Sequence, residues 1–144
     1  MLKLEDFKAA KKRVDEVILP THLIHSDAFS EECGNDVYIK PENLQKTGAF
    51  KIRGAYNKIM KLDDEAKKRG LIASSAGNHA QGVALGAKMT GINATIVMPA
   101  TAPLAKVTAT KGYGAEVVLN GLVYDDAYAK AVEIQKETGA TFLH

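Results

Sequence analysis

Lys51 is the side chain in this sequence best placed to act as a nucleophile. It lies between two apolar residues, Phe50 and Ile52, where a helix is expected to begin. Burial at such a position would favour the neutral amine, and nearby cations such as Arg53 would act in the same direction. Lys51 could then form a Schiff base with a carbonyl compound. On residue types alone, a solvated basic surface remains the more common explanation.

A second segment, residues 74–79, could bind an anion. Its sequence is Ser-Ser-Ala-Gly-Asn-His, and it lies between an expected strand and an expected helix. Ligands of parallel sheets bind beyond the carboxyl ends of the strands, where a helix N-terminus offers free N–H groups. Small residues would let the backbone approach a carboxylate, and Asn78 and His79 add directed polar contacts. A plain helix cap explains the same residues equally well.

Alternating apolar runs and helical patterns predict the elements that must position these groups. Strands are expected at residues 36–40, 71–74, 94–98, 116–119 and 140–143. Helices are expected at residues 4–18, 50–60, 63–69, 78–90, 103–111 and 124–138, and residues 21–30 are expected to be extended or irregular. This alternation favours an α/β fold: an open, mainly parallel twisted sheet with helices on both faces.

Composition excludes several classes of protein. The 144 residues are 46% hydrophobic and 25% charged, which suits one globular domain rather than a disordered chain. A net charge of +2 predicts no nucleic-acid partner, and no apolar run is long enough to span a membrane. Cys33 is the only cysteine, so a disulfide scaffold is excluded. The absence of a secretory signal favours a cytoplasmic protein.

Other candidate sites are weak. His22 and His25 have no cysteine or carboxylate at a metal-ligand spacing, so no metal site is expected. The glycines at residues 112 and 114 lack the third glycine of a dinucleotide-binding loop and stand at a helix end instead.

Residues 40–55 and 75–84 together resemble the threonine dehydratase (threonine ammonia-lyase) and serine dehydratase family of fold-type II pyridoxal-phosphate enzymes, which also includes serine racemases. Residues 102–107 and 114–119 match the same family in the same order. The resemblance implies pyridoxal 5'-phosphate as cofactor. It also implies that residues 50–144 form the small α/β domain, and that residues 1–49 form an N-terminal helical arm belonging with the large domain of relatives.

The resemblance assigns a role to each matching residue. Lys51 would bond to the cofactor aldehyde and then act as the catalytic base at the substrate Cα. Phe50 would pack beside the cofactor, and Asn78 would hydrogen-bond its 3-oxygen. The substrate carboxylate would be held by the loop Ser75, Ala76, Gly77, Asn78 and His79.

The reaction implied is α,β-elimination from L-threonine or L-serine, which gives a 2-oxo acid and ammonia. Relatives also imply isoleucine biosynthesis and a homo-oligomeric full-length form. The glycine-rich loop that holds the cofactor phosphate in the family has no counterpart here, so the chain resembles the N-terminal part of such an enzyme and is expected to be inactive or weak by itself. The alternative is a non-catalytic remnant, an amino-acid-binding or interaction module that retains the small-domain fold. A β-replacement enzyme similar to cysteine synthase is disfavoured by the Gly77-Asn78-His79 form of the loop.

Ala76 is the departure from the family with the clearest consequence. Serine racemases carry a second serine at this position, which acts as the acid–base group on the opposite face of the substrate. Alanine has no proton to transfer, so Ala76 favours a dehydratase over a racemase.

Overall fold

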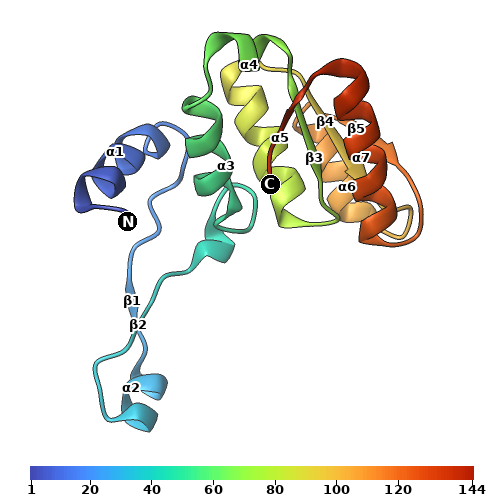
Figure 1. The fold of residues 1–144 in the computed structure, drawn as a ribbon. Helices are drawn as coiled ribbons and strands as arrows, with labels where there is room; N and C mark the ends of the chain where they lie inside the picture. Colours follow the sequence, from blue (N-terminus) through green and yellow to red (C-terminus); the bar gives the residue numbers. More distant parts are fainter.

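A four-stranded parallel sheet lies at the centre of the computed structural model, which describes residues 1–144 (Figure 1). The strand order is β5-β4-β3-β6, with all neighbours parallel. Their bounds are β3 (Leu71–Ser74), β4 (Ala94–Met98), β5 (Glu116–Leu119) and β6 (Thr141–Phe142). Leu71 pairs with Ala94 on one side and with Thr141 on the other, so the carboxyl ends of the strands lie at one edge.

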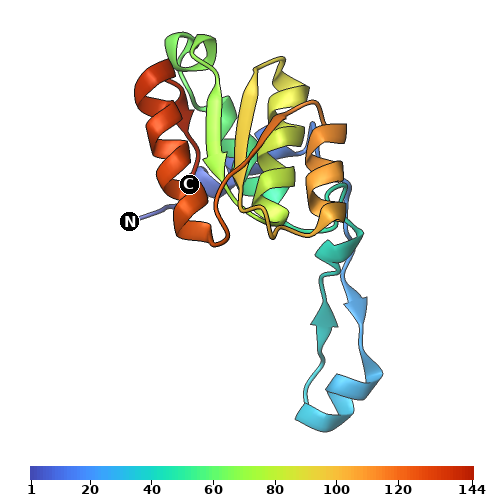
Figure 2. The ribbon, with the colours of Figure 1, turned by 90° about the vertical axis from the view of Figure 1, so that its right-hand side faces the viewer.

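Helices cover both faces of this sheet, as Figure 2 shows: α7 lies on one face, and α5 and α6 on the other. Their bounds are α3 (Lys51–Met60), α4 (Asp64–Lys68), α5 (Asn78–Thr90), α6 (Leu104–Gly112) and α7 (Tyr124–Thr138). Helix α3 packs on the outer side of α5. This arrangement confirms the predicted α/β architecture.

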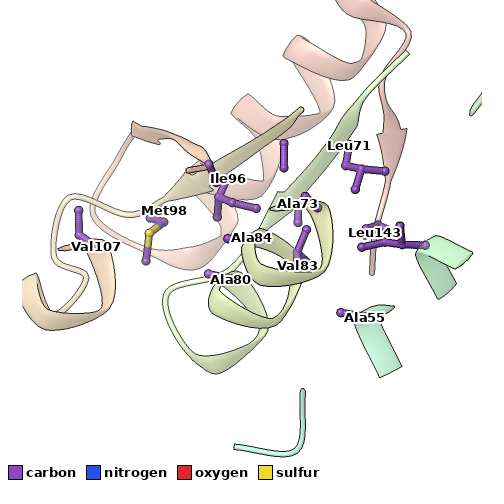
Figure 3. Close-up of a cluster of buried hydrophobic side chains, with 14 residues drawn as sticks. Ala55, Leu71, Ala73, Ala80, Val83, Ala84, Ile96, Met98, Val107 and Leu143 are labelled. Atoms are coloured by element: carbon purple, nitrogen blue, oxygen red, sulfur yellow. The ribbon is translucent and has the colours of Figure 1, made fainter. Parts of the chain in front are cut away.

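The main core lies between the sheet and α5. Small side chains of α5, among them Ala80, Val83 and Ala84, pack against Ala73 of β3 and Ile96 of β4 (Figure 3). All five are at most 1% exposed. Because the α5 side chains are small, the helix axis lies close to the sheet, and its first turn is held firmly at the carboxyl edge.

The N-terminal segment contains α1 (Leu4–Val14), β1 (Ile24–His25), α2 (Asp27–Cys33), β2 (Tyr38–Ile39) and the 3-10 turn η1 (Glu42–Leu44). Strands β1 and β2 pair antiparallel, and together with α2 they project away from the sheet and its helices (Figures 1 and 2). Val14 and Val17 join a cluster with Ile52 of α3, so the first helix packs against the α/β unit.

Two expectations for this segment are wrong in part. The first helix ends at Val14 rather than at residue 18, and residues 15–17 form a turn. Residues 21–26 are extended or irregular as expected and include β1, but residues 27–30 are helical because α2 begins at Asp27. The cause is local: the Ser26 Oγ accepts a hydrogen bond from the Phe29 N–H, and Gly34 ends α2 with a φ of 65°.

The other elements follow the sequence closely. The strands at 71–74, 94–98 and 116–119 and the helix at 78–90 have the predicted bounds. The division into residues 1–49 and 50–144 stays a prediction. None of the helices combines the length and apolar character needed to cross a membrane.

Candidate active site

The first turn of α3 places Lys51 and Phe50 at the surface. Helical periodicity buries Ile52 and Tyr56 against α1 and α5, and it leaves Lys51 outside the buried face. Lys51 is therefore exposed, and the expected burial of its amine is wrong. Its Nζ lies 5.2 Å from the centroid of the Phe50 ring, which is itself 56% exposed. A primary amine and an aromatic face are thus open to a ligand together.

Gly82 sets the distance between this turn and α5. A Cβ built on Gly82 would lie 3.0 Å from the carbonyl carbon of Lys51 and 3.1 Å from the backbone nitrogen of Ile52. These are rigid backbone atoms, so only glycine allows the two helices to approach this closely. One helical turn separates Gly82 from Asn78, so the contact also fixes Lys51 near the N-terminus of α5.

A pocket of about 240 Å³ opens beside Lys51. It is lined by Phe50, Lys51, Gly54, Ala55, Lys58, His79, Leu143 and His144. His79 is fixed there because its Nε2 donates to the Leu143 carbonyl oxygen at 3.1 Å. The structure therefore brings together two residues predicted separately, Lys51 and His79. It also adds Lys58 and His144, which sequence reasoning missed. Lys58 could have been found, because it lies seven residues after Lys51 on the same helix face.

The loop before α5 presents backbone donors beside this pocket. The Ser75 Oγ accepts the Gly77 N–H at 3.2 Å, and no side chain caps α5. The first N–H groups of an α-helix have no partner within the helix, and they favour an anion. Ser75, Ala76 and Gly77 are partly buried and do not line the pocket. These three residues lie next to the pocket, because His79, two residues after Gly77, lines it.

Asn78 is exposed at the first position of α5. Its Oδ1 accepts a hydrogen bond of 2.5 Å from Lys106 Nζ, a residue of the neighbouring helix α6. The side-chain NH₂ group is left free to donate to a ligand. Lys106 belongs to residues 102–107, which resemble the family in sequence, but the sequence alone assigned it no role.

A partly buried network ties the N-terminal segment to α3. Arg53 donates to both carboxylate oxygens of Glu42, at 2.9 and 2.7 Å, and the Thr21 hydroxyl donates to Glu42 at 2.6 Å. The hydrogen bonds from Arg53 lower the pKa of Glu42 to about 2, and burial opposes them only in part. The pKa of Arg53 is raised, chiefly by its hydrogen bonds to Glu42. Since Arg53 follows Lys51 by two residues, the network anchors the turn that carries the amine.

These groups fit the aldehyde and ring end of pyridoxal phosphate. Lys51 offers an exposed primary amine, Phe50 offers a flat aromatic face, and Asn78 offers a free amide N–H. The helix N-terminus beside them suits a carboxylate. Residues 1–144 contain no group of three or more His, Cys, Asp or Glu side chains able to hold a metal ion.

Comparisons with known proteins point to the same cofactor. The family model described as pyridoxal-phosphate dependent enzyme matches residues 14–144. The L-threonine ammonia-lyase of Thermotoga maritima is 56% identical over 144 residues, which are 100% of this chain and 36% of that protein. Maize serine racemase superimposes with a TM-score of 0.92 at 37% identity, over 99% of this chain and 43% of the other. The processed form of threonine deaminase isoform 2 from Solanum lycopersicum superimposes with a TM-score of 0.86 at 34% identity, over 99% of this chain and 41% of the other.

Proposed function

The chain belongs to the pyridoxal-phosphate dependent enzyme family, and from that premise we propose that it is part of an L-threonine ammonia-lyase, which converts L-threonine to 2-oxobutanoate and ammonia. The chain spans only 36% of the length of the Thermotoga maritima relative, so the activity is proposed for the whole protein. The observation that carries the proposal is the exposed Lys51 amine in a pocket shared with His79, next to the uncapped N-terminus of α5.

Lys51 has the main chemical role in this proposal. Its amine would hold the cofactor aldehyde and, when free, would take the proton from the substrate Cα. Pyridoxal phosphate supplies an electron sink for the pair of electrons left at Cα. The Phe50 ring lies beside the amine, where it can support the flat face of the cofactor. The Asn78 amide can donate to the ring 3-oxygen.

The loop from Ser75 to His79 orients the substrate. Its backbone N–H groups and the positive end of α5 bind the substrate carboxylate. With the carboxylate fixed there, the Cα–H bond can be turned toward Lys51. Loss of the β-hydroxyl with a proton, as water, would then complete the α,β-elimination, and hydrolysis of the released enamine would give the 2-oxo acid and ammonia.

Serine racemisation is the second candidate activity, because maize serine racemase shares this fold at 37% identity. Ala76 argues against it. A racemase needs a proton donor on the face of the substrate opposite Lys51, and the methyl group of alanine cannot donate one. We therefore propose α,β-elimination rather than racemisation, with L-threonine and L-serine as substrates.

Compartment, pathway and assembly are proposals as well. The single cysteine, Cys33, is free and exposed, which suits the reducing cytoplasm. Production of 2-oxobutanoate would supply isoleucine biosynthesis, and the resemblance to dehydratases implies a homo-oligomer.

The experiment that tests the function adds pyridoxal phosphate to the purified whole protein, for which the activity is proposed, and records the visible absorbance. Assays for ammonia and 2-oxobutanoate with L-threonine follow. We expect a protein-bound absorbance band and product formation, both lost in Lys51→Ala. Lys88→Ala, which changes an exposed lysine at the far end of α5, is the matched control. A band that survives in Lys51→Ala, or no product in the unmodified protein, would refute the proposal.

A further inference from the structure

Asn78 is oriented by a partner that can only donate hydrogen bonds. An asparagine amide has an acceptor oxygen and a donor nitrogen that can exchange places by a simple flip. An ammonium group has no acceptor, so the 2.5 Å contact with Lys106 Nζ selects the orientation with Oδ1 toward α6. The amide NH₂ group must then point away from Lys106. The contact therefore decides which end of Asn78 is presented to a ligand.

Lys106 occupies an electrostatically unusual position. It is the third residue of α6, and it meets Asn78 at the first residue of α5, so the positive ends of two helices converge on its ammonium group. Neither helix has an acidic residue in its first turn. Lys106 also takes part in none of the ion pairs of the structure. The positive charge at this corner is therefore not neutralised by the protein, and it favours an anionic ligand.

We propose that Lys106 is a positioning residue that holds the Asn78 amide with its NH₂ group directed to an anionic oxygen of the ligand. This inference rests on the proposed function, in which that oxygen is the 3-oxygen of the cofactor ring. Lys106 acts through Asn78 rather than on the reacting atoms. Its positive charge adds to the potential that attracts anions to the start of α5.

Three variants test this role. Lys106→Met removes the donor, and Lys106→Arg keeps a donor and a positive charge. Lys111→Met makes the same charge change on an exposed residue in the last turn of α6. We expect Lys106→Met to weaken binding of pyridoxal phosphate about tenfold and to change the absorbance band of the bound cofactor, as expected for loss of one charge-assisted hydrogen bond. Lys106→Arg should recover most of the affinity, and Lys111→Met should leave it unchanged.

Two further measurements distinguish positioning from a general structural effect. In ¹⁵N-labelled protein without cofactor, the side-chain amide resonances of Asn78 should move in Lys106→Met and stay in place in Lys111→Met. With cofactor, Lys106→Met combined with Asn78→Ala should bind no more weakly than Asn78→Ala alone.

The outcomes separate this inference from the proposed function. If the unmodified protein shows no cofactor band, the proposed function fails, and the role toward the cofactor fails with it. If the band is present but the double variant loses cofactor affinity by the product of the losses in Lys106→Met and Asn78→Ala, only the positioning role is overturned. Unchanged Asn78 amide resonances in Lys106→Met would overturn it as well, whatever the activity.

Discussion

The pairing of Glu42 with Arg53 predicts a specific dependence of stability on pH. The folded-state pKa of Glu42 is about 2 instead of 4.5. That difference corresponds to about 3 kcal/mol of stability at neutral pH. Some of it is lost to solvent screening, because the side chains of Arg53 and Glu42 are 29% and 17% exposed. Replacing the carboxylate in Glu42→Gln should therefore cost about 2 kcal/mol at pH 7.

The sign of the effect follows from the lowered pKa. Above pH 4.5 the carboxyl group is ionised in both the folded and the unfolded states, and its contribution is fully present. As the pH falls from 4.5 toward 2, the unfolded state takes up a proton first, and the contribution disappears. The Glu42→Gln variant lacks this group, so the stabilities of the two proteins should converge over that range.

The assay is urea denaturation followed by far-UV circular dichroism, at several pH values between 7 and 2.5. Glu65→Gln is the control, because its ion pair with Lys68 lies at the surface with both side chains 73% exposed. Surface pairs contribute at most about 1 kcal/mol, so this control should change little. The reasoning would be refuted if the unmodified protein and Glu42→Gln differed in free energy of unfolding by the same amount at pH 7 and at pH 2.5. It would also be refuted if Glu65→Gln lowered that free energy as much as Glu42→Gln does.

Four further substitutions have expected outcomes. Gly82→Ala should lower the free energy of unfolding by about 1–2 kcal/mol, because overpacking against rigid backbone outweighs the better helix propensity of alanine. Gly54→Ala should instead raise it by up to about 1 kcal/mol, because the added Cβ would meet nothing within 4 Å. Thermal denaturation of both variants checks this. Gln45→Leu should destabilise by about 1–3 kcal/mol in the same assay, because the buried Gln45 amide bonds both the N–H and the C=O of Leu19, at 2.8 and 2.9 Å. Ala76→Ser should raise the ratio of D-serine to pyruvate formed from L-serine, measured by chiral chromatography; an unchanged ratio would contradict the role given to Ala76.

The sequence predicts the sheet better than the N-terminal segment, and the reason is the range of the interactions. The strand at Leu71–Ser74 is a short apolar run directly after Gly70, so local composition defines it. Helix α2 is short and exposed, with no buried residue. Only its cap Ser26 and its terminal Gly34 mark it, which is too weak a signal to recognise without the structure.

Long-range pairings in the site were also beyond sequence reasoning. Thr21, Glu42 and Arg53 are separated by up to 32 residues, and no local pattern indicates that they meet. The same holds for Lys106 and Asn78, which lie on different helices. Such contacts depend on how α3, α5 and α6 pack. That packing is set by close approaches such as the one at Gly82.

The accessibility of Lys51 nevertheless follows from the sequence once the helical period is applied consistently. Ile52, Tyr56 and Ile59 recur at the spacing of one helix face, and all three are buried. The residues at Lys51, Gly54 and Lys58 must then share the other side, where the structure places them around the pocket. Apolar neighbours along the chain are thus a poor guide to the burial of a helical lysine. This fold gives Lys51 an amine that a ligand can reach, held in place because its neighbours on the opposite face of α3 are buried.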